Sequence, residues 1–166
     1  MVNITENEIH VSENQQKYYN YKVQMQRLKK AMDNQFYLEA IFIEYVIMED
    51  RTSSILRYEG NTVKTRTENG FISIDAKIRR IIKISEDKNG VAKRYFTEEF
   101  LTEVLEWKNQ RNSLMHALMK QSLTTEELRG LAEEGEQLVK KLSRLSQNYK
   151  GYLERHDMLK DTKDNQ

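Results

Sequence analysis

The sequence predicts an all-α protein, and three observations lead to that prediction. The 166 residues include no proline and only six glycines, so the turn residues that an all-β protein needs are scarce. Apolar residues recur at alternating spacings of three and four, which is typical of a helix with one buried face. Apolar residues make up 38% of the chain and charged residues 32%. We therefore expect one bundle of four to five mainly antiparallel helices.

The first half of the chain predicts two long helices. Ser12 and Gln15 form a plausible capping box at the start of the first one, and Asp33-Asn34 either breaks or bends it. The second helix is expected at about 35–59, ending at Gly60, since glycine is favoured just after a helix. The apolar stripes of the two helices are Tyr18, Tyr21, Met25, Leu28, Met32 and Tyr37, Ile41, Tyr45, Met48, Ile55, Tyr58.

The second half predicts three more helices. The first is short, at about 73–84, between polar loops at 61–70 and 85–90. Thr97 is expected to cap the next helix, which runs to about residue 120, because acidic residues follow the threonine and favour the positive end of a helix dipole. Thr124 begins a second capping box, with Glu127, ahead of a long last helix with a regular apolar stripe.

The domain organisation follows from where this periodicity starts and stops. Residues 1–11 carry no sustained period and are expected to form a flexible N-terminal arm. Residues 12–159 form a single helical domain, and 160–166 a polar C-terminal tail. No internal repeat is visible.

Composition excludes several classes of function. With 27 basic and 26 acidic residues, the chain lacks the global positive field of a general nucleic-acid coat, although a local basic cleft remains open. The absence of cysteine excludes disulfides and thiolate chemistry. The N-terminus does not resemble a signal peptide, and the longest apolar run, 40–48, is too short to span a bilayer. We therefore expect a cytoplasmic protein with no membrane contact.

The usual cofactor and metal motifs are missing too. No two histidines stand at metal-ligand spacing, and no glycine-rich phosphate loop occurs, so neither a cofactor nor a metal is expected. His10 is interpreted as a solvated side chain of the arm, and His156 as a packing or surface residue. The tyrosines of the first two helices are interpreted as core and interface residues rather than platforms for stacking RNA bases.

The run Arg111-Asn112-Ser113-Leu114-Met115-His116 is the one segment that suggests chemistry. Asn112 and His116 are four residues apart and share a helix face, and the long Arg111 side chain can reach the same edge. A permanent cation, an amide and a group that titrates near neutrality suit attack on a phosphodiester. Glu44 and Arg51, seven apart in the second helix, are candidate supporting residues, with a buried ion pair or an exposed charge as the simpler interpretation.

This motif, late in a long helix of a small bundle, resembles the R-x4-H motif of HEPN domains, in which asparagine often follows the arginine. The resemblance implies a metal-independent endoribonuclease that forms 2′,3′-cyclic phosphates. It also implies a homodimer paired through the motif helices, so that both chains line one cleft. By position, Arg111 would bind the scissile phosphate, His116 would act as general acid or base, and Asn112 would orient one of them. The expected partners are RNA, a second copy of the chain and an antitoxin, in toxin–antitoxin or phage-defence systems.

One position departs from a subset of these toxins. That subset has a modifiable tyrosine two residues after the histidine, where this chain has Leu118, so control by such modification is not expected. Two alternatives stay open: a catalytically inactive HEPN-type module for dimerisation or ligand binding, and an unrelated helical interaction protein.

Overall fold

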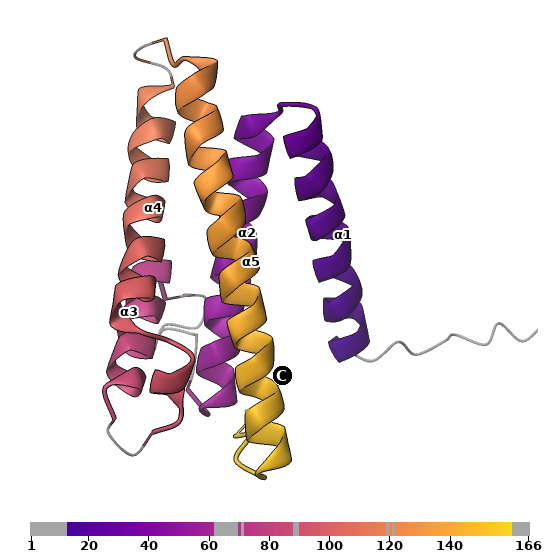
Figure 1. Cartoon of the computed structure of the whole chain (residues 1–166), viewed down its shortest axis with the longest axis vertical. Coiled ribbons are helices and arrows are strands. Elements are labelled where there is room, and N and C mark those ends of the chain that lie inside the picture. Colours follow the sequence, from indigo (N-terminus) through magenta and orange to yellow (C-terminus); the bar gives the residue numbers. More distant parts are fainter. Residues whose placement is uncertain are drawn as a thin grey trace, which may run out of the picture.

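The computed structural model describes residues 13–61, 70, 72–87, 90–118, 120 and 122–160. These residues form a bundle of five α-helices without strands, as Figure 1 shows. The all-α prediction is thus confirmed, with the helix number at the upper end of the expected range. The helices are α1 (Glu13–Asp33), α2 (Tyr37–Tyr58), α3 (Ile74–Ser85), α4 (Glu98–Ala117) and α5 (Thr125–Arg155), and a short 3-10 turn, η1 (Ala92–Arg94), which was not predicted, precedes α4.

Side-chain caps fix the starts of the later helices, as the sequence predicted. The Thr97 hydroxyl accepts a hydrogen bond from the Phe100 amide at the start of α4. Thr124 and Glu127 form the full capping box of α5, which satisfies amides that have no partner inside the helix. Just after the C-terminal end of α2, Gly60 has φ +73°, a conformation that glycine adopts without strain. The proposed Ser12 cap lies outside the described residues.

The chain breaks, rather than bends, between α1 and α2. Gln35 adopts a positive φ of 60°, which reverses the chain direction. The Phe36 amide donates to the Ala31 carbonyl at 2.8 Å and the Asn34 amide to the Lys30 carbonyl at 3.0 Å. These bonds satisfy two of the carbonyls that a helix end leaves open, so α1 and α2 form an antiparallel helical hairpin.

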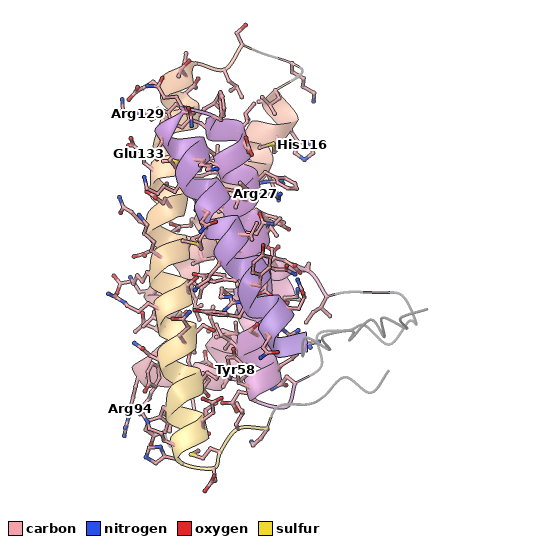
Figure 2. All side chains as sticks on the ribbon, turned by 90° about the vertical axis from the view of Figure 1, so that its right-hand side faces the viewer. Arg27, Tyr58, Arg94, His116, Arg129 and Glu133 are labelled. Atoms are coloured by element: carbon pink, nitrogen blue, oxygen red, sulfur yellow. The ribbon has the colours of Figure 1, made fainter. Side chains whose placement is uncertain are left out.

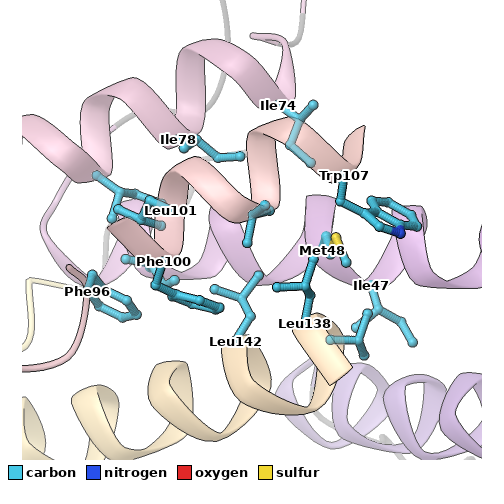
Figure 3. Close-up of a cluster of buried hydrophobic side chains, with 14 of the residues drawn as sticks. Ile47, Met48, Ile74, Ile78, Phe96, Phe100, Leu101, Trp107, Leu138 and Leu142 are labelled. Carbon is cyan, nitrogen blue, oxygen red and sulfur yellow. The ribbon is translucent and has the colours of Figure 1, made fainter. Parts of the chain in front are cut away.

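Helix α2 is the centre of the bundle. It packs against α1, α3 and α5, and Figure 1 shows α5 crossing in front of it, with α1 on one side and α3 and α4 on the other. The core between α2, α3, α4 and α5 is built from aliphatic and aromatic side chains (Figure 3). Trp107 is fully buried there, and its indole N–H donates to the Leu131 carbonyl at 2.9 Å, which ties α4 to α5.

The predicted arm at 1–11, with His10, and all but the first residue of the tail at 160–166 lie outside the described residues. Among the described helices, none is long and apolar enough to cross a membrane. The ring of His156 stacks on Tyr152 with 4.0 Å between centroids, in agreement with a packing role.

Candidate functional site

The predicted motif lies in the last two turns of α4. Arg111 and Asn112 are half-buried, and His116 is exposed in the final turn. Figure 2 shows His116 towards one end of the bundle.

Arg111 is held in place without a carboxylate. Its guanidinium carbon lies 4.6 Å from the centroid of the Tyr45 ring, on α2. Its Nη1 donates to the Asn112 Oδ1 at 3.2 Å, while its Nε is buried and has no hydrogen-bond partner. Within the described ranges no carboxylate lies within 4 Å of it. The guanidinium is therefore positioned by an aromatic face and an amide, and its positive charge is not neutralised.

The structure brings together two of the three motif side chains. Arg111 and Asn112 are in contact, whereas no hydrogen bond in the described part of the chain joins His116 to either of them. Five positions separate Arg111 from His116, which places them about 140° apart around the helix axis. One chain alone therefore presents a cation and an imidazole that do not converge on one phosphate.

Glu44, a candidate supporting residue, lies in the core. Its side chain is fully buried, and both carboxyl oxygens lack a hydrogen-bond partner. The carboxyl group occupies the space that Gly135 leaves: a Cβ on that glycine would lie 2.1 Å from Glu44 Oε2 and 2.7 Å from Trp107 Cζ2. Burial, with the negative charge of Glu136 as a smaller cause, raises the pKa of Glu44 to about 9. Glu44 is thus a neutral core residue at pH 7.

Arg51, the other candidate supporting residue, lies elsewhere on α2. Its guanidinium forms an ion pair with Asp50 at 2.5 Å and lies 4.7 Å from the centroid of the Tyr21 ring, on α1. It does not pair with Glu44, and none of its described contacts involves Arg111. The seven-residue spacing put Glu44 and Arg51 near one face of α2, but Glu44 faces Gly135 of α5, whereas Arg51 contacts Tyr21 of α1.

Two features of the site were not predicted from the sequence. Tyr45 is the ring on which Arg111 stacks, and nothing in the spacing of α2 and α4 residues could pair them. Next to Tyr45, an apolar stripe on α2 is exposed to solvent: Leu38 at 39%, Phe42 at 58% and Val46 at 40%. The spacing of four residues places these side chains on one helix face, but it does not show whether that face is buried or exposed.

Comparison with protein-family models, with curated proteins and with solved structures finds no match to this chain. The resemblance to HEPN domains therefore rests on the six-residue motif and on the order of the helices. Among the described residues, no group of three or more histidine, aspartate or glutamate side chains is arranged to hold a metal ion.

Proposed function

We propose that this protein is a HEPN-type, metal-independent endoribonuclease that acts as a homodimer. The observation that carries the proposal is Arg111: a stacked, half-buried guanidinium with no carboxylate partner in the described residues, five positions from an exposed histidine. A fixed cation of this kind favours a phosphate, which a guanidinium can bind through two parallel hydrogen bonds. The wider setting, a toxin–antitoxin or phage-defence system with an antitoxin partner, comes from the resemblance alone.

The reaction needs only groups that the motif supplies. The ribose 2′-oxygen attacks phosphorus, the bond from phosphorus to the 5′-oxygen breaks, and the 2′-hydroxyl proton is replaced by one on the leaving oxygen. His116 of one chain takes the 2′-hydroxyl proton and then gives a proton to the leaving 5′-oxygen, beside Arg111 of the other chain. Arg111 stabilises the charge that grows on the phosphorane oxygens. The products are a 2′,3′-cyclic phosphate and a 5′-hydroxyl, and no water is consumed.

The apolar stripe of α2 (Leu38, Phe42 and Val46) supports pairing of two chains at this site. An apolar surface beside a polar cluster is a frequent mark of a protein interface, and this stripe adjoins Tyr45, which holds Arg111. A two-fold axis near the stripe would bring two copies of the motif to one cleft. Phe42→Glu would place two like charges across that axis, and we expect it to convert the dimer to a monomer in sedimentation experiments.

The direct test is incubation of the purified protein with RNA in EDTA, followed by analysis of the fragment ends. We expect the wild type to produce 2′,3′-cyclic phosphate ends and His116→Ala to lose cleavage by at least about 100-fold, in the range of general acid–base catalysis. His156→Ala is a matched control on a histidine outside the motif. Cleavage that persists in His116→Ala would refute the assignment of His116, and an inactive but dimeric wild type would point to a catalytically silent module.

A further inference from the structure

A second polar site lies between α1, α2 and α5, far from the motif. It is a pocket of about 210 Å³ whose walls carry four cationic side chains: Lys17, Arg51, Arg57 and Lys150. Tyr58, which also lines it, lies towards one end of the bundle in Figure 2, and His116 lies towards the other. Three helices therefore converge to place four positive charges around one space.

The carboxylates near the pocket do not balance these charges. Asp50 pairs with Lys17 at 3.2 Å and with Arg51 at 2.5 Å. Lys150 pairs with Glu154, one turn further along α5, at 3.2 Å. Arg57 donates to the Ser54 hydroxyl at 3.1 Å, and no carboxylate in the described ranges lies within 4 Å of it. Four cations against two carboxylates leave an excess of two positive charges.

The ionisation of Lys17 reflects this excess. Burial is the main cause that lowers the pKa of Lys17, and the positive charges of Arg57 and Arg51 lower it further, against the opposing effect of Asp50. One carboxylate therefore does not fully offset the cost of placing this ammonium among other cations. An anion in the pocket would supply the missing negative charge.

The polar groups of the pocket suit a tetrahedral oxyanion. Arginine forks and lysine ammonium groups donate several hydrogen bonds each, and the tyrosine hydroxyls and the amide of Gln147 add further donors. A phosphomonoester carries between one and a half and two negative charges near neutral pH, which matches the excess of about two on the protein side. A neutral or singly charged ligand would leave part of that charge uncompensated.

We propose that this pocket binds a phosphomonoester dianion, carried by a small molecule such as a nucleotide or by the 5′ end of an RNA. The proposal uses no residue of the motif on α4, so it stands or falls independently of the ribonuclease. We assign the phosphate contacts to Arg57 and Lys150. In the described part of the chain, each of them pairs only with a residue of its own helix, so both can turn towards a ligand.

The test compares ligands that differ only in the phosphate, by isothermal titration calorimetry on the full chain at low salt. The ligands are adenosine 5′-monophosphate against adenosine, and a 5′-phosphorylated RNA oligomer against the same oligomer with a 5′-hydroxyl. We expect tighter binding of the phosphorylated member in at least one pair, and the pair that responds more strongly identifies the carrier. Equal binding within both pairs, or no binding at all, would overturn the proposal.

A double variant separates this pocket from the general charge of the surface. Arg57→Gln/Lys150→Gln should weaken binding by at least tenfold. The control Arg129→Gln/Lys140→Gln removes the same two residue types and the same charge from α5, where both side chains pair with carboxylates of their own helix, and should change affinity less than twofold. Equal losses in both variants would contradict a specific site. The single variant Lys150→Gln, at a 40% exposed side chain, gives the same test if the double variant is poorly folded.

Discussion

Two arginines of this bundle stack on tyrosines in nearly the same way, yet their surroundings differ. Arg51 lies 4.7 Å from the Tyr21 ring and Arg111 lies 4.6 Å from the Tyr45 ring. Arg51 also pairs with Asp50 at 2.5 Å, whereas Arg111 has only the Asn112 amide as a hydrogen-bond partner within the described residues. The first guanidinium joins α1 to α2 with a counterion beside it, and the second carries an open positive charge at the protein surface.

The difference teaches how a charge without a partner persists in a small helical fold. Removing a charge from water is costly unless an opposite charge or hydrogen bonds replace the water. Arg51 is 8% exposed and has Asp50. Arg111 is half-buried and keeps part of its hydration, so no carboxylate is required. Glu44 is fully buried with no partner, and it becomes neutral instead. Of these three groups, Arg111 is the one whose charge is open to a ligand.

The largest expected effect is the loss of RNA cleavage on replacing Arg111, which we expect to act in catalysis rather than in stability. Arg111→Gln should lower RNA cleavage by about 100- to 1,000-fold, because a fixed cation would no longer stabilise the phosphorane, while the free energy of unfolding should change by about 1 kcal/mol or less, the scale of one cation–π contact. Cleavage assays and urea unfolding measure the two effects. A loss of stability that accounts for the lost activity would show that Arg111 is structural.

The matched variant on the other side of the comparison is Arg51→Gln. It leaves Asp50 partly buried with one cation fewer, and we expect the free energy of unfolding to fall by about 2 kcal/mol, as when a hydrogen bond to a charged group is removed. If Arg111→Gln destabilises the protein more than Arg51→Gln does, the distinction between a paired and an open guanidinium is wrong.

The second prediction concerns the charge that the core does not tolerate. The folded-state pKa of Glu44, about 9, lies above its ordinary value of 4.5. Its contribution to stability is therefore complete below pH 4.5 and is lost as the pH rises through about 9. At pH 7, keeping Glu44 protonated in the folded state lowers the free energy of unfolding by about 3 kcal/mol. Glu44→Gln should remove this cost and flatten the pH dependence of the free energy of unfolding between pH 5 and 9.

Urea unfolding of wild type and Glu44→Gln at pH 5, 7 and 9 checks this prediction. The two proteins should converge at pH 5, and the variant should be the more stable at pH 9. Parallel curves at all three pH values would mean that Glu44 is ionised in the folded protein and has a partner.

The third prediction tests the space that Glu44 occupies. Gly135→Ala would place a methyl group against the Glu44 carboxyl and the Trp107 ring, and overpacking of this kind lowers stability by about 1–3 kcal/mol. Gly151→Ala, in the same helix with no atom within 4 Å of the new Cβ, should instead raise stability by about 0.5–1 kcal/mol through helix propensity. Thermal unfolding of both variants measures the contrast. If Gly135→Ala raised stability instead, the close packing of Gly135 against Glu44 and Trp107 would be contradicted.

The smallest expected effect comes from removing the carboxylate that pairs with Arg51, which leaves Arg51, like Arg111, without an acidic partner. Burial acts to raise the pKa of Asp50, but the charges of Arg51 and Lys17 and their hydrogen bonds lower it overall. Its contribution to stability is therefore present above pH 3.8 and is lost as the pH falls through the folded-state pKa. Asp50 is 36% exposed and screened by water, so Asp50→Asn should lower stability at pH 7 by only about 1 kcal/mol. Denaturation of both proteins at pH 7 and pH 3 should show a difference that shrinks in acid.

Local patterns were enough to predict most of the fold. The caps at Thr97 and Thr124 depend on residues within four positions of each other, so the sequence contains all that is needed to place them. The break at Gln35 was ambiguous because Asp33-Asn34 tolerates both a bend and a stop, and the contacts of the hairpin decide between them. The 3-10 turn η1 carries no periodic signal, since three residues are too few to show a repeat.

The candidate site was predictable only in part. The motif on α4 is local, and the Arg111–Asn112 contact follows from adjacency. The stacking of Arg111 on Tyr45 joins two helices, so one sequence cannot show it. Glu44 and Arg51 share a face of α2, but the residues opposite them, Gly135 and Tyr21, belong to other helices. Periodicity gives the face of a helix and not the identity of what packs against it.

The composite ribonuclease site is tested most directly by mixing two inactive variants. Arg111→Gln and His116→Ala proteins are unfolded together, refolded to exchange subunits, and assayed for RNA cleavage in EDTA. Each variant alone should be inactive, and the mixture should regain a clear fraction of wild-type activity, since a mixed dimer has Arg111 on one chain and His116 on the other. A mixture no more active than its two parents, with mixed dimers verified by native mass spectrometry, would contradict the account.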